Sequence, residues 1–200
     1  MNKKLLSLVC AICLFAPVAV SARAFDFNIG ATAQFQNDVT TDSFDAEDLT
    51  DPDNYRFGAE TRLNFLLFEV ADTAVFGSST VSNGTVESIE FTNHLAAGIY
   101  KDIFGVLRVG LLAGPEFEMN ITDDGVTDEN GDAFEFTDIF MKSNFTYKAH
   151  VDVLLSQSLT LSASYTLPTE FNLEDSDYTK LIPGDSDWSD GKVGISLLLF

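Results

Sequence analysis

Apolar and polar side chains alternate without a break along residues 25–36. The odd positions are apolar, beginning with Phe25 and Phe27, and the even positions are polar or glycine, beginning with Asp26 and Asn28. Successive side chains of a β-strand point to opposite faces, so this pattern predicts a strand with one apolar and one polar face. The same parity returns in most later segments, which favours a sheet built from such strands.

Eight segments are predicted to be strands, and the connections between them differ in length. The predicted strands are 25–36, 55–68, 73–81, 86–100, 104–120, 134–153, 158–167 and 188–200. Long acidic loops are predicted at about 37–54, 121–133 and 168–187, and Asn83-Gly84 signals a tight hairpin turn. Every connection on the other side is a few residues long. Outer-membrane barrels show this asymmetry, so we predict an all-β fold, a single closed antiparallel up-and-down transmembrane β-barrel of eight strands.

Residues 1–24 have the features of a cleaved secretory signal peptide. Lys3 and Lys4 precede an apolar run over residues 5–20, and Ala22-Arg23-Ala24 matches a signal-peptidase site. Both cysteines of the chain lie in this segment, so the mature domain, residues 25–200, has none. No later apolar run approaches the roughly 20 residues of a spanning helix. A mature chain within a membrane is therefore expected to cross it as a barrel.

The mature chain is strongly acidic. The full sequence has 11 Lys and Arg residues against 31 Asp and Glu residues. Removing Lys3, Lys4 and Arg23 with the signal peptide leaves 8 basic residues against 31 acidic ones, a net charge of −23. Such a chain is not expected to bind nucleic acid, which attracts proteins largely through counterion release. The acidic loops are expected to be solvated rather than to form a specific metal site, and an unknown extracellular partner or divalent cations remain open as binding partners.

The mature basic residues gather on one face of the predicted strands. Six of the eight occupy even strand positions and none occupies an odd strand position: Arg56, Arg62, Arg108, Lys142, Lys148 and Lys192. A barrel lumen can hold such charges, whereas a lipid-facing surface does not tolerate them. The odd face is therefore expected to contact outer-membrane lipid. The predicted lumen charge network comprises Arg56, Glu60, Arg62, Glu90, His94, Arg108, Glu116, Lys142 and Lys148.

The chain ends in an apolar strand, Gly194–Phe200, whose last residue is a phenylalanine. In this motif, and in the architecture of its whole mature part, it resembles the small eight-stranded outer-membrane barrels of the OmpA, OmpX and OmpW type. The resemblance implies a bacterial outer membrane, periplasmic termini, extracellular acidic loops, and a barrel-assembly machinery that recognises the strand ending at Phe200. Phe200 departs from the pattern because the odd residues from Val193 to Leu199 carry the apolar face. A bulge near the end of the chain would reconcile the two parities.

Apolar side chains interrupt the polar even face near the predicted periplasmic rim. They are Leu66, Phe68, Phe76, Leu198 and Phe200. One interpretation is an apolar plug that closes the periplasmic end of the lumen beneath the charged layer. The other is that these residues lie beyond the bilayer core, or that a local bulge turns them toward lipid.

Three classes of function fit this sequence. The first is a structural or surface-contact barrel with a filled lumen, and the second is a narrow channel for small hydrophobic solutes, as the resemblance to OmpW implies. The third is a soluble secreted barrel that carries a ligand, as lipocalins do. His94 and His150 are the only histidines, and no spacing for a Ser-His-Asp or His-His-carboxylate site can be assembled. The sequence therefore predicts no enzyme, cofactor or metal site.

Overall fold

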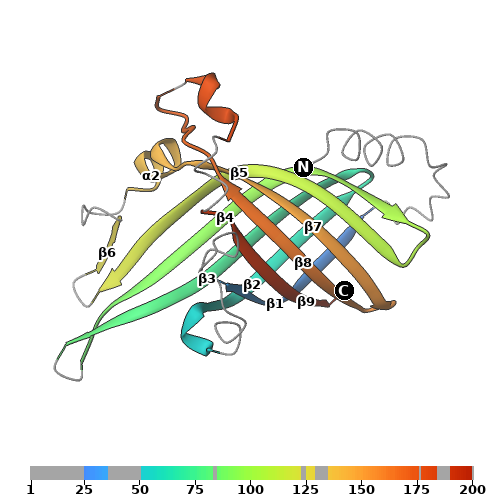
Figure 1. Ribbon diagram of the computed structural model, residues 1–200, viewed down its shortest axis with the longest axis horizontal. Helices are drawn as coiled ribbons and strands as arrows, with labels where there is room; N and C mark the ends of the chain where they lie inside the picture. Colours follow the sequence, from blue (N-terminus) through green and yellow to red (C-terminus); the bar gives the residue numbers. More distant parts are fainter. Residues whose placement is uncertain are drawn as a thin grey trace, which may run out of the picture.

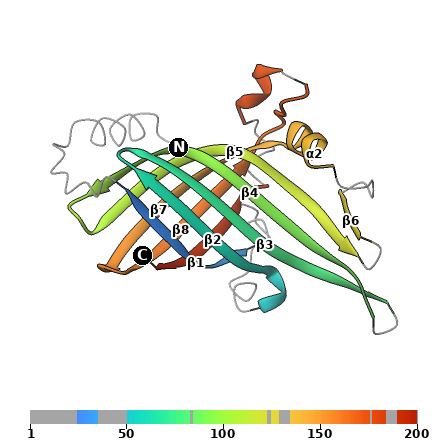
Figure 2. The ribbon, with the colours of Figure 1, turned by 180° about the vertical axis from the view of Figure 1, so that it is seen from behind.

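Eight antiparallel strands form a closed ring in the computed structural model, which describes residues 25–35, 51–82, 85–122, 125–128, 135–175, 177–183 and 190–199. The strands of the ring are β1 (Asp26–Phe35), β2 (Tyr55–Phe65), β3 (Phe68–Ser82), β4 (Thr85–Ile103), β5 (Leu107–Thr122), β7 (Phe145–Ser156), β8 (Leu159–Pro168) and β9 (Lys192–Leu199). Each pairs with its neighbours in chain order, and β9 pairs with β1 to close the ring (Figure 1, Figure 2). The predicted fold class, a closed up-and-down barrel of eight strands, is confirmed.

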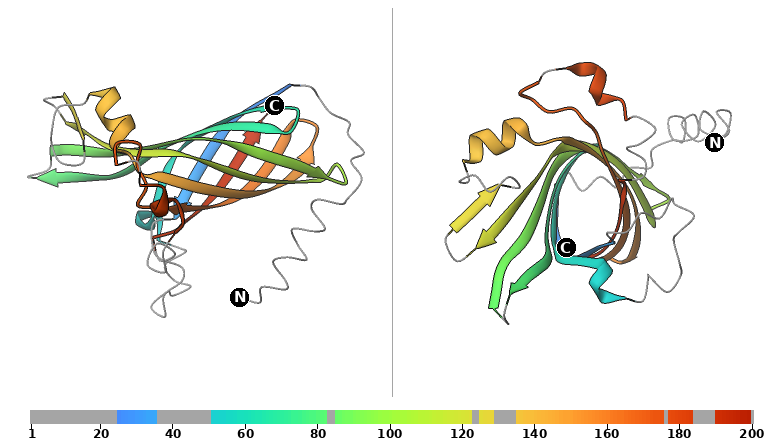
Figure 3. Two further views of the ribbon diagram at one scale, coloured as in Figure 1. Left: turned by 90° about the horizontal axis from the view of Figure 1, so that it is seen from above. Right: turned by 60° about the vertical axis from the view of Figure 1, so that its left-hand side comes forward.

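The two ends of the barrel differ. At one end the strands are joined by the short turns 66–67, 104–106 and 157–158, and β1 begins and β9 ends there. We call this the tight-turn end and the opposite one the loop end. At the loop end β3, β4 and β5 continue past the shorter strands of the ring (Figure 3). The loop-end turn predicted at Asn83-Gly84 lies outside the described residues, but the flanking Ser82 and Thr85 are paired as a hairpin requires.

The described residues include four elements outside the ring. Strand β6 (Gly125–Asp128) pairs with the loop end of β5, where a loop was predicted. The 3-10 helices η2 (Pro52–Asn54) and η3 (Tyr178–Leu181) lie in the connections before β2 and β9. Helix α2 (Phe136–Lys142) replaces the first half of the strand predicted at 134–153. None of the described helices is long and apolar enough to cross a membrane.

The parity of β3 is the reverse of that of β2. Phe65 and Phe68 are paired across the two-residue turn 66–67, so an odd position faces an even one along the whole hairpin. Even residues of β2 such as Glu60 point inward, whereas in β3 the odd residues Glu69 and Val75 do so. The turn predicted at residues 69–72 is therefore wrong, and so is the late start of the third strand. Strand β4 returns to even positions inward.

Pro115 lies where β5 separates from β7. It forms the last residue pair between the two strands, opposite Phe145, and beyond it β5 pairs only with β4 and β6. The following residue restores the backbone contact, because the Glu116 N–H donates to the Asn144 carbonyl at 3.0 Å. Proline has no N–H to give to a ladder, so this rim position is one that it can occupy.

Candidate functional site in the barrel interior

The barrel has a polar inside and an apolar outside. Charged and polar side chains from every strand of the ring are buried in the lumen, among them Arg62, Glu60 and Lys148. Large apolar side chains on the outer wall are exposed, for example Phe27, Leu111 and Val151. Water-soluble proteins bury apolar groups and rarely expose large continuous apolar areas. The polarity is thus reversed relative to a soluble barrel, as the gathering of basic residues at even strand positions predicted.

Arg62 lies at the centre of the lumen, with 1 % of its surface exposed. Its Nε donates to Glu60 at 2.7 Å, its Nη1 to Asp152 at 2.9 Å and its Nη2 to the Ser162 hydroxyl at 2.7 Å. These partners come from β2, β7 and β8, so one guanidinium ties together strands on different sides of the ring. Charge-assisted hydrogen bonds of this kind are the strong ones in proteins.

Glu60 accepts hydrogen bonds from several groups at once. Besides Arg62, it accepts from Lys148 Nζ at 2.6 Å and from the hydroxyl of Ser196 on β9. Lys148 also donates to the Thr73 hydroxyl at 2.8 Å. A buried carboxylate is tolerated only when it is paired and hydrogen-bonded, and Glu60 meets both conditions.

His150 lies between two carboxylates. Its Nδ1 is 3.0 Å from an Asp152 oxygen and its Nε2 is 3.0 Å from a Glu69 oxygen, although the second contact is not aligned as a hydrogen bond. Its Nδ1 also lies 3.0 Å from Arg62 Nη1, which can donate to it, and an N–H on Nε2 would point toward Glu69. We call the group formed by these side chains the central ion network: Glu60, Arg62, Glu69, Lys148, His150 and Asp152.

Gly110 makes room for the His150 ring. A Cβ built on Gly110 would lie 2.0 Å from His150 Nε2, far inside van der Waals contact. The glycine is on β5 and faces the lumen directly opposite His150 in the register between β5 and β7. The absence of a side chain here allows the ring to reach across toward Glu69 on β3.

A second charged group closes the tight-turn end of the lumen. Arg108 donates to Asp102 at 2.7 Å, lies 3.9 Å from Asp26, and stacks its guanidinium 4.4 Å from the centre of the Tyr100 ring. Leu198 is buried at the inner face near this end, and Ala71, Ala96 and Leu112 form a small apolar cluster on β3, β4 and β5. Side chains therefore fill the described lumen from the centre to the tight turns, as expected for a barrel of eight strands.

A third charged group lies at the loop end, and we call it the mouth: Arg56, Glu90, Glu116, Glu118 and Lys192. Arg56 contacts Glu90 at 2.8 Å and Glu118 at 3.3 Å. Lys192 contacts Glu116 at 3.1 Å and Glu118 at 3.5 Å. Unlike the central ion network, these ion pairs are partly exposed to solvent.

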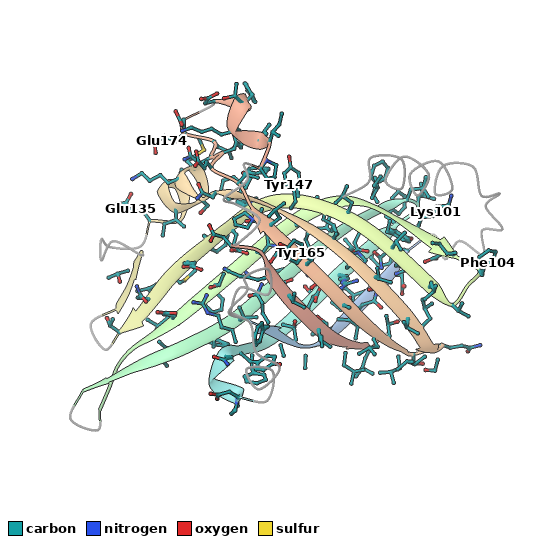
Figure 4. The ribbon with its side chains drawn as sticks, in the orientation of Figure 1. Lys101, Phe104, Glu135, Tyr147, Tyr165 and Glu174 are labelled. Carbon is teal, nitrogen blue, oxygen red and sulfur yellow. The ribbon has the colours of Figure 1, made fainter. Side chains whose placement is uncertain are left out.

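Outside the barrel, residues 169–175 and 177–183 contact β7 at the loop end (Figure 4). The Tyr147 hydroxyl donates to the Leu181 carbonyl at 3.0 Å, and the rings of Phe145 and Phe171 lie 5.4 Å apart. Hydrogen bonds from the Thr179 side chain and backbone lower the pKa of the exposed Asp177. The acidic character predicted for 168–187 is thus carried, in its described part, by a structured segment on the outer wall.

Most residues predicted for the lumen charge network face the interior. Those that do are Arg56, Glu60, Arg62, Glu90, His94, Arg108, Glu116 and Lys148. Lys142 does not, because it lies on α2 and is exposed. Within the observed charge groups, Arg108 contacts Asp102 and Glu90 contacts Arg56. Glu69 and Asp152 were missed: Asp152 has the even parity that marks the lumen, but Glu69 is odd and requires the parity change at turn 66–67.

The predicted apolar plug is wrong for three of its five residues. Leu66 lies in the turn, and Phe68 and Phe76 are 61 % and 50 % exposed on the outer wall. The reversed parity of β3 explains why these even-numbered residues of β3 point outward. Leu198 does lie inside the barrel, and Phe200 is outside the described residues.

Comparisons with known proteins find similarity at the level of structure alone. No family model and no curated protein matches the sequence. Among solved structures, Neisserial surface protein A is 12 % identical over 90 % of this chain and 97 % of its own, with a TM-score of 0.47. The attachment invasion locus protein Ail of Yersinia pestis is 12 % identical over 88 % of this chain and 94 % of its own, with a TM-score of 0.46. A structure of Ail with the heparin analogue sucrose octasulfate is 14 % identical with a TM-score of 0.45.

The geometry of this chain agrees with the architecture that the sequence predicted. Eight strands form one closed ring, with charged side chains on its inner face and apolar side chains on its outer face.

Proposed function

We propose that this protein is a bacterial outer-membrane barrel whose lumen is closed and whose loop end acts by surface contact. The observation that carries the proposal is the reversed polarity, with ions buried inside and apolar side chains exposed outside. Strands β1, β2 and β8 are 10, 11 and 10 residues long. These lengths match the roughly 9–11 residues with which a tilted strand crosses the hydrocarbon core. The tight-turn end then faces the periplasm and the acidic loop end faces outward.

The two alternatives have less support from the geometry. A lipocalin-like carrier needs an apolar interior, but the buried interior described here is dominated by charged and hydroxyl side chains. A channel for hydrophobic solutes needs an apolar path, and the central ion network lies across the lumen. The proposal assigns no enzymatic step, and the described residues contain no group of three His, Cys, Asp or Glu side chains placed to hold a metal ion.

Cysteine labelling tests the placement in the membrane. Ala31 and Ala163 are exposed on the outer wall of β1 and β8. We expect Ala31→Cys and Ala163→Cys in intact outer membranes to react with a lipid-soluble thiol reagent and not with a charged, impermeant maleimide. Glu174→Cys, on the exposed loop-end segment, is the matched control and should react with the impermeant reagent (Figure 4). Extraction of the protein without detergent, or labelling of Ala31→Cys by the charged reagent, would refute membrane insertion.

Conductance tests the closed lumen. The purified barrel should show no stable open-channel current in planar bilayers, because the central ion network and the side chains below it fill an eight-stranded lumen. The double variant Phe68→Ala, Phe76→Ala should behave in the same way, since both rings are on the outer wall. A persistent current through the wild-type protein would favour the channel function. A current that appears only in the double variant would support the interpretation in which Phe68 and Phe76 plug the lumen.

A further inference from the structure

The mouth contains a cavity between its ion pairs. Its volume is about 200 Å³, and it is lined by Arg56, Glu90, Thr92, Glu118, Met119 and Asn120. Its wall combines the carboxylates of Glu90 and Glu118 with polar groups of Thr92 and Asn120 and with the guanidinium of Arg56. The cavity is large enough for a small organic molecule and lies at the end of the barrel that carries the acidic loops.

The acidic groups of the mouth are the more accessible ones. The side chains of Glu90 and Glu118 are 46 % and 43 % exposed, whereas those of Arg56 and Lys192 are 15 % and 19 % exposed. With Glu116, three carboxylates face two cations, which leaves one net negative charge. A molecule entering the mouth therefore meets carboxylate oxygens before it meets the guanidinium or the ammonium.

A smaller polar chamber lies deeper in the lumen. It has a volume of about 10 Å³, which is room for roughly one water-sized group. Hydroxyls of Thr32, Thr73 and Thr166 contribute to its lining, together with His94, Glu116 and Lys148. Thr92 lines both the chamber and the mouth cavity, so the two spaces are neighbours.

His94 leaves an unmet acceptor at this chamber. Its Nε2 is 3.2 Å from the Thr146 carbonyl, which can only accept, so the proton is on Nε2. In the neutral ring Nδ1 is then an acceptor, and this buried atom has no protein partner. A buried polar atom without a partner is unfavourable by comparison with one that is hydrogen-bonded. A hydrogen-bond donor in the chamber, of the size of a water molecule or an ammonium group, would therefore satisfy His94 Nδ1.

The floor of the chamber is closed to further passage. Lys148 already donates to Glu60 at 2.6 Å and to Thr73 at 2.8 Å, and Arg62 lies below it in the central ion network. We call the mouth cavity and the chamber together the blind site, because they share Thr92 and the central ion network lies beneath the chamber.

We propose that this blind site binds an alkylammonium group, a primary amine at the end of a flexible aliphatic chain. The ammonium passes the exposed carboxylates of Glu90 and Glu118 beside Arg56, its aliphatic chain lies in the mouth cavity, and its terminal N–H donors meet Glu116 and His94 Nδ1. Two sources share this chemistry, a free polyamine and a lysine side chain of a protein. The inference depends on the proposed function only for the side of the membrane that the mouth faces, and labelling of Glu174→Cys with the impermeant maleimide in intact cells checks that separately.

The test is a titration of the full mature chain, refolded in detergent micelles, with spermidine and with N-acetyl-lysine methylamide. Calorimetry should detect saturable binding of at least one of the two probes. Glu118→Gln and Glu90→Gln should each weaken that binding about tenfold or more, the effect of losing a charge-assisted hydrogen bond. Both side chains are nearly half exposed, so these variants should fold, which heat-modifiable gel migration verifies.

The matched control is Glu174→Gln, which removes one exposed carboxylate from the loop-end segment outside the barrel, where Glu174 lines neither cavity (Figure 4). It should leave the affinity for the probe within about twofold. The ¹⁵N resonance of His94 Nδ1, assigned with a His94→Gln variant, should shift as the probe fills the chamber. Binding of spermidine alone identifies a free polyamine as the source, and equal or tighter binding of the lysine analogue identifies a protein side chain.

Three results would overturn the proposal. They are no saturable binding of either probe, equal weakening by Glu174→Gln and Glu118→Gln, and equally tight binding of the neutral alcohol 1-pentanol. The first would leave the chamber as a site for water alone. The second would mean that the probe is attracted by the overall negative charge of the loop end and not by the carboxylates of the mouth.

Discussion

Arg62→Ala is expected to destabilise the folded barrel by about 3–5 kcal/mol, because removing one partner of a buried ion pair leaves the other charges stranded. Arg62 contacts Glu60 at 2.7 Å and Asp152 at 2.9 Å, and Glu69 lies 3.8 Å away. All three carboxylates are buried, so water cannot replace the guanidinium without opening the ring. The midpoint of urea unfolding in lipid vesicles, followed by heat-modifiable migration on gels, measures the change.

Arg56→Ala is the matched control for Arg62→Ala. It also removes an arginine with two carboxylate partners, but Glu90 and Glu118 are nearly half exposed and remain hydrated without it. Exposed ion pairs contribute about 0–1 kcal/mol, so the midpoint should move little. Equal midpoints for the two variants would mean that water reaches the central ion network, and the lumen would then be open.

Gly110→Ala is expected to destabilise the barrel by about 1–3 kcal/mol, the usual effect of overpacking a filled interior. The new Cβ would lie 2.0 Å from His150 Nε2 and push the ring away from Glu69. Denaturant unfolding measures this effect alone and in a double-mutant cycle with His150→Ala. The combined variant should lose less than the sum of the two single losses, because no ring remains for the methyl group to displace.

Additive losses would contradict this explanation of Gly110. They would mean that the alanine methyl group meets the strand backbone or another side chain, and that His150 occupies its place independently of the glycine.

Alternating parity predicts much of this barrel because it reports a local property. A strand with lipid on one side and charged side chains on the other requires apolar and polar residues to alternate. Eight of the predicted network residues were found from this alternation. The partners of those residues were not predictable. Arg62 reaches Asp152 across the lumen, and that meeting depends on the stagger of β2 against β7, which no local pattern encodes.

The errors also have physical causes. The two-residue turn 66–67 reverses parity between β2 and β3. Extending the second predicted strand to residue 68 placed Phe68 on the inner face, and carrying the same parity into the third strand placed Phe76 there as well. The strand prediction for the region before β7 was wrong for another reason. Ile139 and Phe140 stand beside Lys142 in a short apolar stretch that fits helical and strand periods alike, and the structure has α2 there.

The pairing of β9 with β1 has a consequence for the order of assembly. It joins Ile29 to Leu199 and Phe35 to Val193, which are 170 and 158 residues apart in the sequence. The Ser196 hydroxyl on β9 donates to Glu60 and lies within hydrogen-bond distance of the Thr32 hydroxyl, so the central carboxylate is completed only when β9 docks. Contacts of such high sequence separation form late, after the entropy of closing the chain has been overcome. The chain therefore cannot bury its charged side chains one strand at a time. The pairing of β9 with β1 and the desolvation of these charges are expected to occur in the same step.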